Sequence, residues 1–210
     1  MLEALERSRL GVGDRLSEDA RKELADLDAD VRVREAALDL LSYRARTRQE
    51  LETRLRQKDF PVGRIRRCLA DLEGKGLLDD EAVAAAFVRD RLRHRPRGKS
   101  RLVSELRAKG VDAGLATDAI EQVFGDEEVT DAGLAREAAE RWVARQGAAT
   151  LEALGHAART SERDKARRRL YGYLARRGFR GEALTHALDH ADLVARARAN
   201  PGEPRASRNA

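Results

Sequence analysis

The sequence predicts an all-α protein of tandem three-helix repeats, helix-turn-helix-like in form, that stack into an elongated, curved array. Three observations lead to this prediction. Ala, Leu, Arg and Glu dominate the 210 residues, and proline occurs only four times. No alternating run of Val, Ile and Thr is long enough for a strand. A fixed set of apolar spacings also occurs three times along the chain.

The repeated unit contains two helices joined by a tight turn. Five apolar residues in each copy are spaced four, five, five and four positions apart: Leu51, Leu55, Phe60, Ile65, Leu69; Leu102, Leu106, Val111, Ala116, Ile120; and Leu170, Leu174, Phe179, Leu184, Leu188. The turns are predicted at Lys58-Asp59-Phe60, Lys109-Gly110-Val111 and Arg177-Gly178-Phe179. Because a basic residue and then glycine commonly end a helix, these turns separate two helices. Spacing alone leaves another kind of helical solenoid open.

A further helix is expected in front of each pair. Its apolar residues are Ala37, Leu38 and Leu41 in the first repeat, Phe87, Val88 and Leu92 in the second, and Leu134, Ala138 and Trp142 in the third. Thr47 and Glu50 form a capping-box pattern, and the other expected N-caps are Ser17, Asp79, Asp112 and Ser161.

This pattern divides the chain into five segments. They are an acidic leader with a short helix (1–30), the first repeat (31–78), the second repeat (79–125), the third repeat with a longer internal connection (126–198) and a disordered tail (199–210). The longer connection, 146–160, is expected to carry a short extra helix over Leu151 and Leu154.

Residues that could carry chemistry are scarce. The single cysteine, Cys68, excludes an intrachain disulfide and is expected in the core. His186 and His190 lie one helical turn apart but lack the glutamate of a zinc-protease motif, so we expect exposed histidines. We predict a protein that is not an enzyme and that uses neither a metal nor a cofactor. The absence of a long apolar run or a signal-peptide core predicts a cytoplasmic protein with no membrane contact.

Basic residues gather around the second helix of each repeat. Residues 89–101 contain seven Arg or Lys against one acid, residues 163–180 contain eight against one, and Arg44, Arg46 and Arg48 precede or begin the corresponding helix of the first repeat. Such a surface can neutralise phosphates or meet an acidic protein, and a simply solvated face is the third interpretation.

Several of these motifs resemble the bacterial RecX family of recombination regulators. In the first repeat they are Tyr43-Arg44-Ala45-Arg46, the capping Thr47, and Glu50-Leu51. Gly76-Leu77-Leu78-Asp79-Asp80, followed by Phe87 and Arg91, is similar to the family's most recognisable signature. Arg97-Gly98-Lys99-Ser100-Arg101-Leu102 and Glu105–Val111 resemble the start of its second repeat. The third repeat fits more loosely, and Asp59 departs from the glycine of the other two turns.

The resemblance implies a regulator, mainly an inhibitor, of the RecA recombinase in homologous recombination, DNA repair and the SOS response. It implies a monomer that lodges in the groove of the RecA–single-stranded DNA filament and lowers ATPase, recombinase and co-protease activity, with weak, non-specific affinity for DNA itself. The expected contact residues are Arg44, Arg46, Arg48, Arg97, Arg101, Lys109, Arg176 and Arg177.

Two other functions remain open from the sequence. One is direct DNA binding by helix-turn-helix-like repeats, without a requirement for RecA. The other is a helical scaffold for which neither DNA nor RecA matters.

Overall fold

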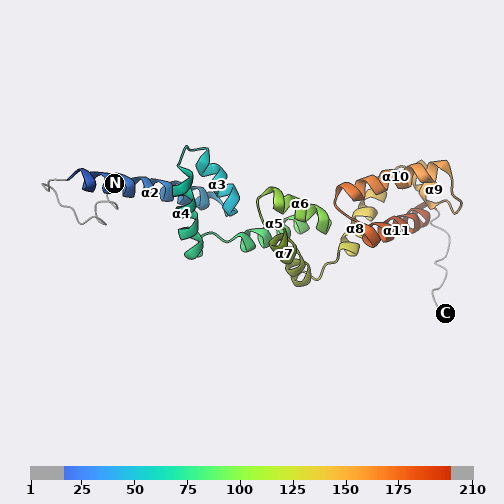
Figure 1. Cartoon of the computed structure of the whole chain (residues 1–210). Helices are drawn as coiled ribbons and strands as arrows, with labels where there is room; N and C mark the ends of the chain where they lie inside the picture. Colours follow the sequence, from blue (N-terminus) through green and yellow to red (C-terminus); the bar gives the residue numbers. More distant parts are fainter. Residues whose placement is uncertain (1–16, 200–210) are drawn as a thin grey trace. The chain divides into compact units, whose positions relative to one another are not determined.

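The computed structural model describes residues 17–199, and every regular element in that range is an α-helix (Figure 1). The all-helical prediction is therefore confirmed for the described residues. The helices are α2 (Glu18–Tyr43), α3 (Arg48–Arg56), α4 (Val62–Gly74), α5 (Asp80–His94), α6 (Lys99–Ala108), α7 (Ala113–Asp126), α8 (Asp131–Val143), α9 (Ala148–Gly155), α10 (Ser161–Arg176) and α11 (Gly181–Ala199).

Side-chain caps fix where several of these helices begin. Ser17 Oγ accepts a hydrogen bond from the Ala20 N–H at 3.2 Å, and Thr47 Oγ1 accepts one from the Glu50 N–H at 3.1 Å, both as predicted. In the third repeat the cap is Thr160, not Ser161, and its Oγ1 accepts from the Arg163 N–H at 3.1 Å. Thr160 has the extended backbone that an N-cap needs, whereas Ser161 is already helical.

The described chain forms two compact units. The first comprises residues 17–84 and the turn at 108–112, and its core lies where α2, α3 and α4 pack together. The core side chains are Val33, Ala37, Leu51, Leu55, Ile65, Leu69, Leu72 and Leu78. Leu38, expected in this core, is instead 36% exposed, because Val33 and Ala37, one helical turn apart, define the face of α2 that packs inward.

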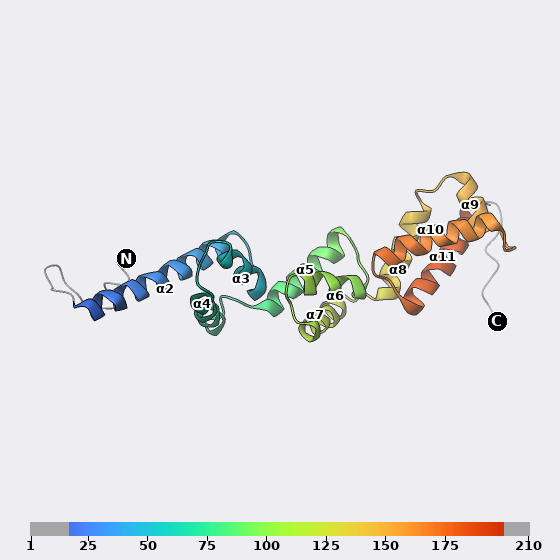
Figure 2. The same ribbon diagram turned by 45° about the horizontal axis from the view of Figure 1, so that its top comes forward.

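Helix α2 does not break at residue 30, where the predicted leader meets the first repeat. It is one helix of 26 residues without an internal glycine or proline, so the expected short leader helix is part of it. No residue before Val31 is buried within the described part of α2, and Figures 1 and 2 show its first turns extending beyond α3 and α4. Residues 1–16, including the Leu10–Asp14 motif, lie outside the described residues.

The second unit comprises residues 85–107 and 113–199. The predicted apolar residues of its two repeats are buried, among them Leu102, Leu106 and Ile120, and Leu170 and Phe179. Helices α8, α10 and α11 pack against one another in its C-terminal part. The spacing pattern therefore identified the buried face of each second and third helix.

The short helix expected in the long connection is present as α9. Leu154 is completely buried, and α9 packs on α10 and α11. Arg196 Nε donates to the Gly155 carbonyl at 3.0 Å, which fixes the end of α9 to α11. Helix α11 continues through Ala199, and residues 200–210 of the predicted tail lie outside the described residues.

The three predicted turns share a left-handed residue. Gly110 has φ 86° and Gly178 has φ 89°, and Asp59 adopts φ 61° at the matching position of the first turn. The amides of Phe60 and Phe179 then donate back to Leu55 O and Leu174 O, at 3.4 and 3.3 Å, as in a Schellman motif. Asp59 therefore changes the residue but not the form of the turn.

Candidate functional site

The second helix of the first two repeats begins against residues of the following repeat. Asp80 Oδ1, at the start of α5, accepts from the Arg48 N–H at 2.7 Å, and Asp131 Oδ1, at the start of α8, accepts from the Lys99 N–H at 2.9 Å. Burial raises the pKa of both carboxyl groups, and the backbone hydrogen bonds oppose that rise. Each aspartate thus supplies an acceptor for a helix-start amide that lacks one within its own helix.

The turn of the following repeat packs against the same helix start. Thr47 Oγ1 donates to the Lys109 carbonyl in the first case. In the second case, Ser100 Oγ donates to the Gly178 carbonyl at 2.9 Å, and the Gly98 N–H donates to the Arg177 carbonyl at 2.9 Å. We call these contacts, including the aspartate bonds, the first joint (Thr47, Arg48, Asp80, Lys109, Gly110) and the second joint (Gly98, Lys99, Ser100, Asp131, Arg177, Gly178).

The basic residues of the first joint are paired within the chain. Glu50 accepts from Lys109 Nζ at 2.8 Å and from Arg44 Nη1 at 3.1 Å. Burial alone would raise the pKa of Glu50, but these two hydrogen bonds lower it from 4.5 to about 2. Arg46 Nε donates to the Leu40 carbonyl at 3.0 Å, and Arg48 forms an ion pair with Glu73. Four of the eight predicted contact residues therefore have partners in the first unit.

The second joint carries a different charge pattern at matching positions. Arg101 takes the place of Glu50, because Leu102 aligns with Leu51, and it pairs with Glu105 on its own helix at 2.8 Å. Arg177 takes the place of Lys109, and neither it nor Arg176 has an acidic partner among residues 17–199. The carboxylate that pairs with Lys109 therefore has no counterpart beside Arg177.

Arg97 and Arg177 line one cavity beside the second joint, with a volume of about 260 Å³. We call it the arginine pocket. None of its nine lining residues is acidic, and six are basic or histidine: His94, Arg95, Arg97, Arg141, Arg145 and Arg177. Two of the six have acidic partners outside the lining, His94 with Asp90 and Arg141 with Glu137. Among the described residues, Arg95, Arg97, Arg145 and Arg177 have no acidic partner.

The two central guanidinium groups of the arginine pocket are partly withdrawn from water. Arg177 lies over the ring of Tyr173, with 3.9 Å from its central carbon to the ring centroid, and Nε of Arg97 is buried without a hydrogen-bond partner. Burial, and then the positive charges of Arg97, Arg145 and Arg141, lower the pKa of Arg177. The pocket thus concentrates positive charge that the chain itself leaves unbalanced.

Arg101 and Arg176 line a second, wider cavity of about 610 Å³, together with Arg180, Ser100 and Ser104. Like the arginine pocket, it has no acidic lining residue. The structure therefore brings four of the predicted contact residues, Arg97, Arg101, Arg176 and Arg177, to the two cavities beside the second joint. Arg44, Arg46 and Lys109 line another cavity, which contains Glu50.

Much of the remaining positive charge in the two basic runs is paired. Arg163 and Arg167 both bond to Asp192, and Arg89 bonds to Asp126 at 2.9 Å. Lys99 contacts Glu121 at 2.6 Å. Conversely, Arg141 and Arg145 were not recognised in the sequence, because they lie outside both runs, one helical turn apart near the end of α8. Their relation to Arg97 and Arg177 appears only after the repeats fold.

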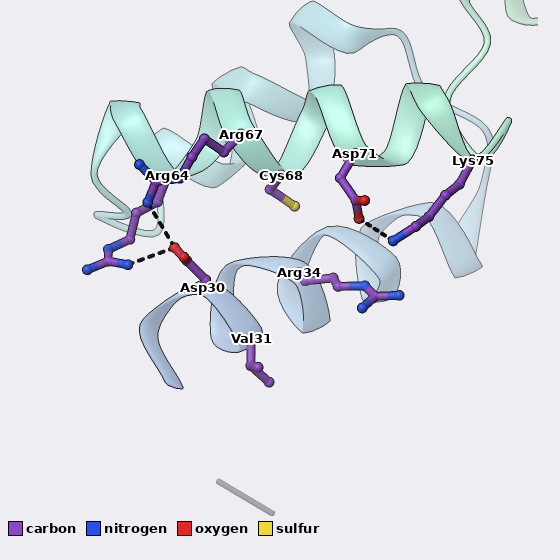
Figure 3. A pocket seen from close by; sticks show the side chains of 8 residues that line it. All are labelled: Asp30, Val31, Arg34, Arg64, Arg67, Cys68, Asp71 and Lys75. Carbon is purple, nitrogen blue, oxygen red and sulfur yellow. Dashed lines mark hydrogen bonds and ion pairs between the residues drawn. The ribbon is translucent and has the colours of Figure 1, made fainter. Parts of the chain in front are cut away.

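A cavity between α2 and α4 shows the opposite arrangement (Figure 3). Asp30 accepts from Arg64 at 2.7 Å and from Arg67 at 3.2 Å, and Lys75 reaches Asp71 at 2.6 Å. Cys68, which was expected in the core, packs against the core of the first unit but is only partly buried and lines this cavity, and burial raises the pKa of its thiol. This cavity therefore has its own balancing acids and no exposed reactive thiolate.

The histidines form no metal site in the described part of the chain. His190 pairs with Glu140, His186 is exposed, and no cluster of three His, Cys, Asp or Glu side chains suits a metal ion between residues 17 and 199. No helix in the same range is long and apolar enough to span a membrane.

Together, these features define a tandem three-helix repeat protein with an unbalanced basic surface beside its second joint. Two family descriptions match it: the first three-helix domain of RecX over residues 34–72 and the second over residues 79–120. Regulatory protein RecX of Corynebacterium efficiens is 40% identical over 168 residues, 79% of this chain and 75% of that protein. Regulatory protein RecX of Streptomyces coelicolor is 38% identical over 148 residues, 70% of each protein. The chain belongs to the RecX family.

Solved structures agree with this assignment. A crystal structure of regulatory protein RecX matches with a TM-score of 0.70 and 25% identity, over 90% of this chain and 87% of that one. RecX from Lactobacillus salivarius matches in fold, with a TM-score of 0.59 and 24% identity, over 79% of this chain and 98% of that one. The tandem three-helix fold is thereby confirmed, and the named relatives are regulatory proteins.

Proposed function

We propose that this protein is a non-catalytic cytoplasmic regulator that binds as a monomer in the groove of the RecA–single-stranded DNA filament and lowers its ATPase, recombinase and co-protease activity. Membership of a family named for regulation supports the role. The location of the contact surface is supported by one observation: several arginines beside the second joint have no acidic partner in the described chain.

The geometry ranks the eight expected contact residues. Arg97, Arg101, Arg176 and Arg177 line the two cavities that have no carboxylate in their lining. Arg97, Arg176 and Arg177 have no acidic partner in the described chain, so their charge is available to a filament that carries DNA phosphates. Arg101 lies beside them but would have to exchange its bond to Glu105. Arg44, Arg46, Arg48 and Lys109 already bond within the first unit, and using them would require those bonds to exchange. We therefore assign the principal contact to the second unit.

RecA's ATP hydrolysis on single-stranded DNA tests this function. The protein is added at increasing ratios, well below one molecule per RecA, and we expect progressive inhibition because each bound molecule affects many RecA subunits. Direct binding to the same DNA is measured in parallel, to separate inhibition from sequestration of the strand. Unchanged hydrolysis up to equimolar protein, together with tight, salt-sensitive binding to duplex DNA alone, would favour the direct DNA-binding function instead.

A further inference from the structure

The arginine pocket contains like charges that the backbone holds together. The Gly98 N–H bonds to the Arg177 carbonyl at 2.9 Å, so Arg97 and Arg177 are adjacent because their neighbouring peptide groups are joined. Arg141 comes from α8 and Arg145 from the turn directly after it, and the first residue of α8, Asp131, is bonded to the Lys99 N–H in the same joint. The second joint therefore fixes all three segments that bring arginines to the pocket.

Charge placed in this way needs a partner from outside the described chain. Like charges in a partly buried setting repel more strongly than in open water, and burying guanidinium donors without acceptors is unfavourable. The Nε atom of Arg97 is one such donor. Tyr173 holds the plane of Arg177 through its ring but supplies no negative charge. An anion in the cavity would satisfy both the charge and the donors.

We propose that the arginine pocket is a binding site for a phosphate group. Arg97, Arg145 and Arg177 supply the positive charge, Arg141 borders the site, and the cavity of about 260 Å³ admits one phosphate with its bound water. Guanidinium groups match phosphate oxygens through paired N–H donors, and several can bind one tetrahedral group from different sides. A single carboxylate, with two oxygens and one charge, would leave most of these donors without acceptors.

The first joint provides an internal comparison. Lys109 occupies the position of Arg177, yet it bonds to Glu50, and the matching cavity contains that carboxylate. The chain thus supplies a carboxylate to Lys109 at the first joint and none to Arg177 at the matching position of the second. This difference argues against a merely repeated, solvated basic face, for which both joints would carry the same charge.

The inference deepens the proposed function and rests on it for its setting, since the DNA of a RecA filament supplies phosphodiesters. Binding itself requires no RecA and is measured without it. A negative result for phosphate binding would therefore not exclude inhibition of RecA. A negative result for RecA inhibition would not exclude the phosphate site.

The test compares two double variants of the full chain with equal charge change. Arg145→Gln/Arg177→Gln alters the pocket, whereas Arg168→Gln/Arg169→Gln alters two exposed arginines of α10 that line neither arginine-rich cavity. Binding to a labelled single-stranded oligothymidylate is measured over a range of salt concentrations, and binding to pyrophosphate is measured by calorimetry. Thermal unfolding checks that both variants fold, and the single variant Arg145→Gln, at an exposed site, replaces the pocket variant if that one does not.

We expect the pocket variant to bind the oligonucleotide about tenfold more weakly, since it loses charge-assisted hydrogen bonds, and to show a salt dependence smaller by about one ion. The control should change less than about twofold. Selective loss of oligonucleotide binding assigns the phosphate to a nucleic-acid strand, and selective loss of pyrophosphate binding assigns it to a free polyphosphate. Equal weakening in the two variants, or none in either, overturns the proposal.

Discussion

At the scale of single residues, the charge of the first joint depends on Glu50. Its carboxylate bonds to both Lys109 and Arg44, from two different repeats, and no other carboxylate lines the same cavity. Replacing this one residue with glutamine removes both ion pairs while keeping the shape of the side chain. The Glu50→Gln variant therefore measures how much the charge of Glu50 contributes to the stability of the protein.

We predict that Glu50→Gln lowers the free energy of unfolding at neutral pH by about 1–2 kcal/mol, because partial exposure screens two charge-assisted bonds. The folded pKa of about 2 lies below 4.5, so this stabilisation is complete above pH 4.5 and is lost as the pH falls toward 2. Urea unfolding of both proteins measures the difference. A difference that stays constant between neutral and strongly acidic pH would show that charge at Glu50 is not its cause.

Asp59 offers a second test at one residue. It has φ 61° at the position that Gly110 and Gly178 occupy in the other turns, so its backbone adopts a left-handed conformation that costs a non-glycine residue energy. We predict that Asp59→Gly stabilises the protein by about 0.5–1 kcal/mol, as measured by chemical denaturation, and that Asp59→Ala does not. Equal stabilities of the glycine and alanine variants would mean that the left-handed backbone is not the cost.

At the scale of elements, the repeats are joined where a turn meets a helix start. A Cβ atom on Gly178 would lie 2.5 Å from the backbone nitrogen of Arg101, and one on Gly98 would lie 2.5 Å from the Gly178 carbonyl. Glycine is therefore required at the second joint for close approach as well as for a positive φ. Gly76 also has a positive φ, of 67°, but nothing lies within 4 Å of a Cβ placed there.

Substitutions at Gly178 and Gly76 distinguish the cost of backbone strain from the cost of a steric clash. We predict that Gly178→Ala lowers the free energy of unfolding by more than about 2 kcal/mol, because it adds a clash with backbone to the strain. Gly76→Ala should cost only the strain, about 1 kcal/mol. Thermal or urea unfolding measures both variants. Equal costs would contradict the close approach of the Arg177–Gly178 turn to α6.

Comparison of the predicted and observed helices shows that sequence patterns identify local features of a helix. Apolar spacing identified the packing faces of α6, α7, α10 and α11, and the capping pattern identified Thr47, because both are local properties. The prediction for α2 was wrong at Leu38, because Leu38 and Val33 are both apolar and only packing against α3 and α4 selects Val33. The continuity of α2 through residue 30 follows from helix propensity, which the division into segments by the repeat pattern did not consider.

The candidate site was only partly predictable for a related reason. Basic runs identified Arg97 and Arg177, but a run contains no information about partners, so paired Arg163 and Arg167 looked equivalent to them. Arg145 joins the pocket from an element outside both runs. Long-range folding decides which positive charges are balanced, and composition cannot.

At the scale of the whole molecule, the basic residues of the two units differ in their partners. In the first unit, Lys109, Arg48, Arg64 and Lys75 pair with Glu50, Glu73, Asp30 and Asp71. In the second unit, Arg97, Arg145, Arg176 and Arg177 have no acidic partner in the described chain. If the proposed function is correct, inhibition of RecA depends on where charge is removed and not on how much. Charge reversal at matched positions distinguishes these possibilities.

The most direct measurement is RecA's single-strand-dependent ATPase activity, titrated with three proteins: wild type, Arg97→Glu/Arg101→Glu and the charge-matched Arg168→Glu/Arg169→Glu. All three are first shown to unfold at similar temperatures. We predict that half inhibition requires at least about tenfold more of the Arg97/Arg101 variant than of wild type, whereas the control stays within about threefold of wild type. Undiminished inhibition by a folded Arg97/Arg101 variant, or an equal loss in both variants, would contradict the assignment of RecA contact to the surface beside the second joint.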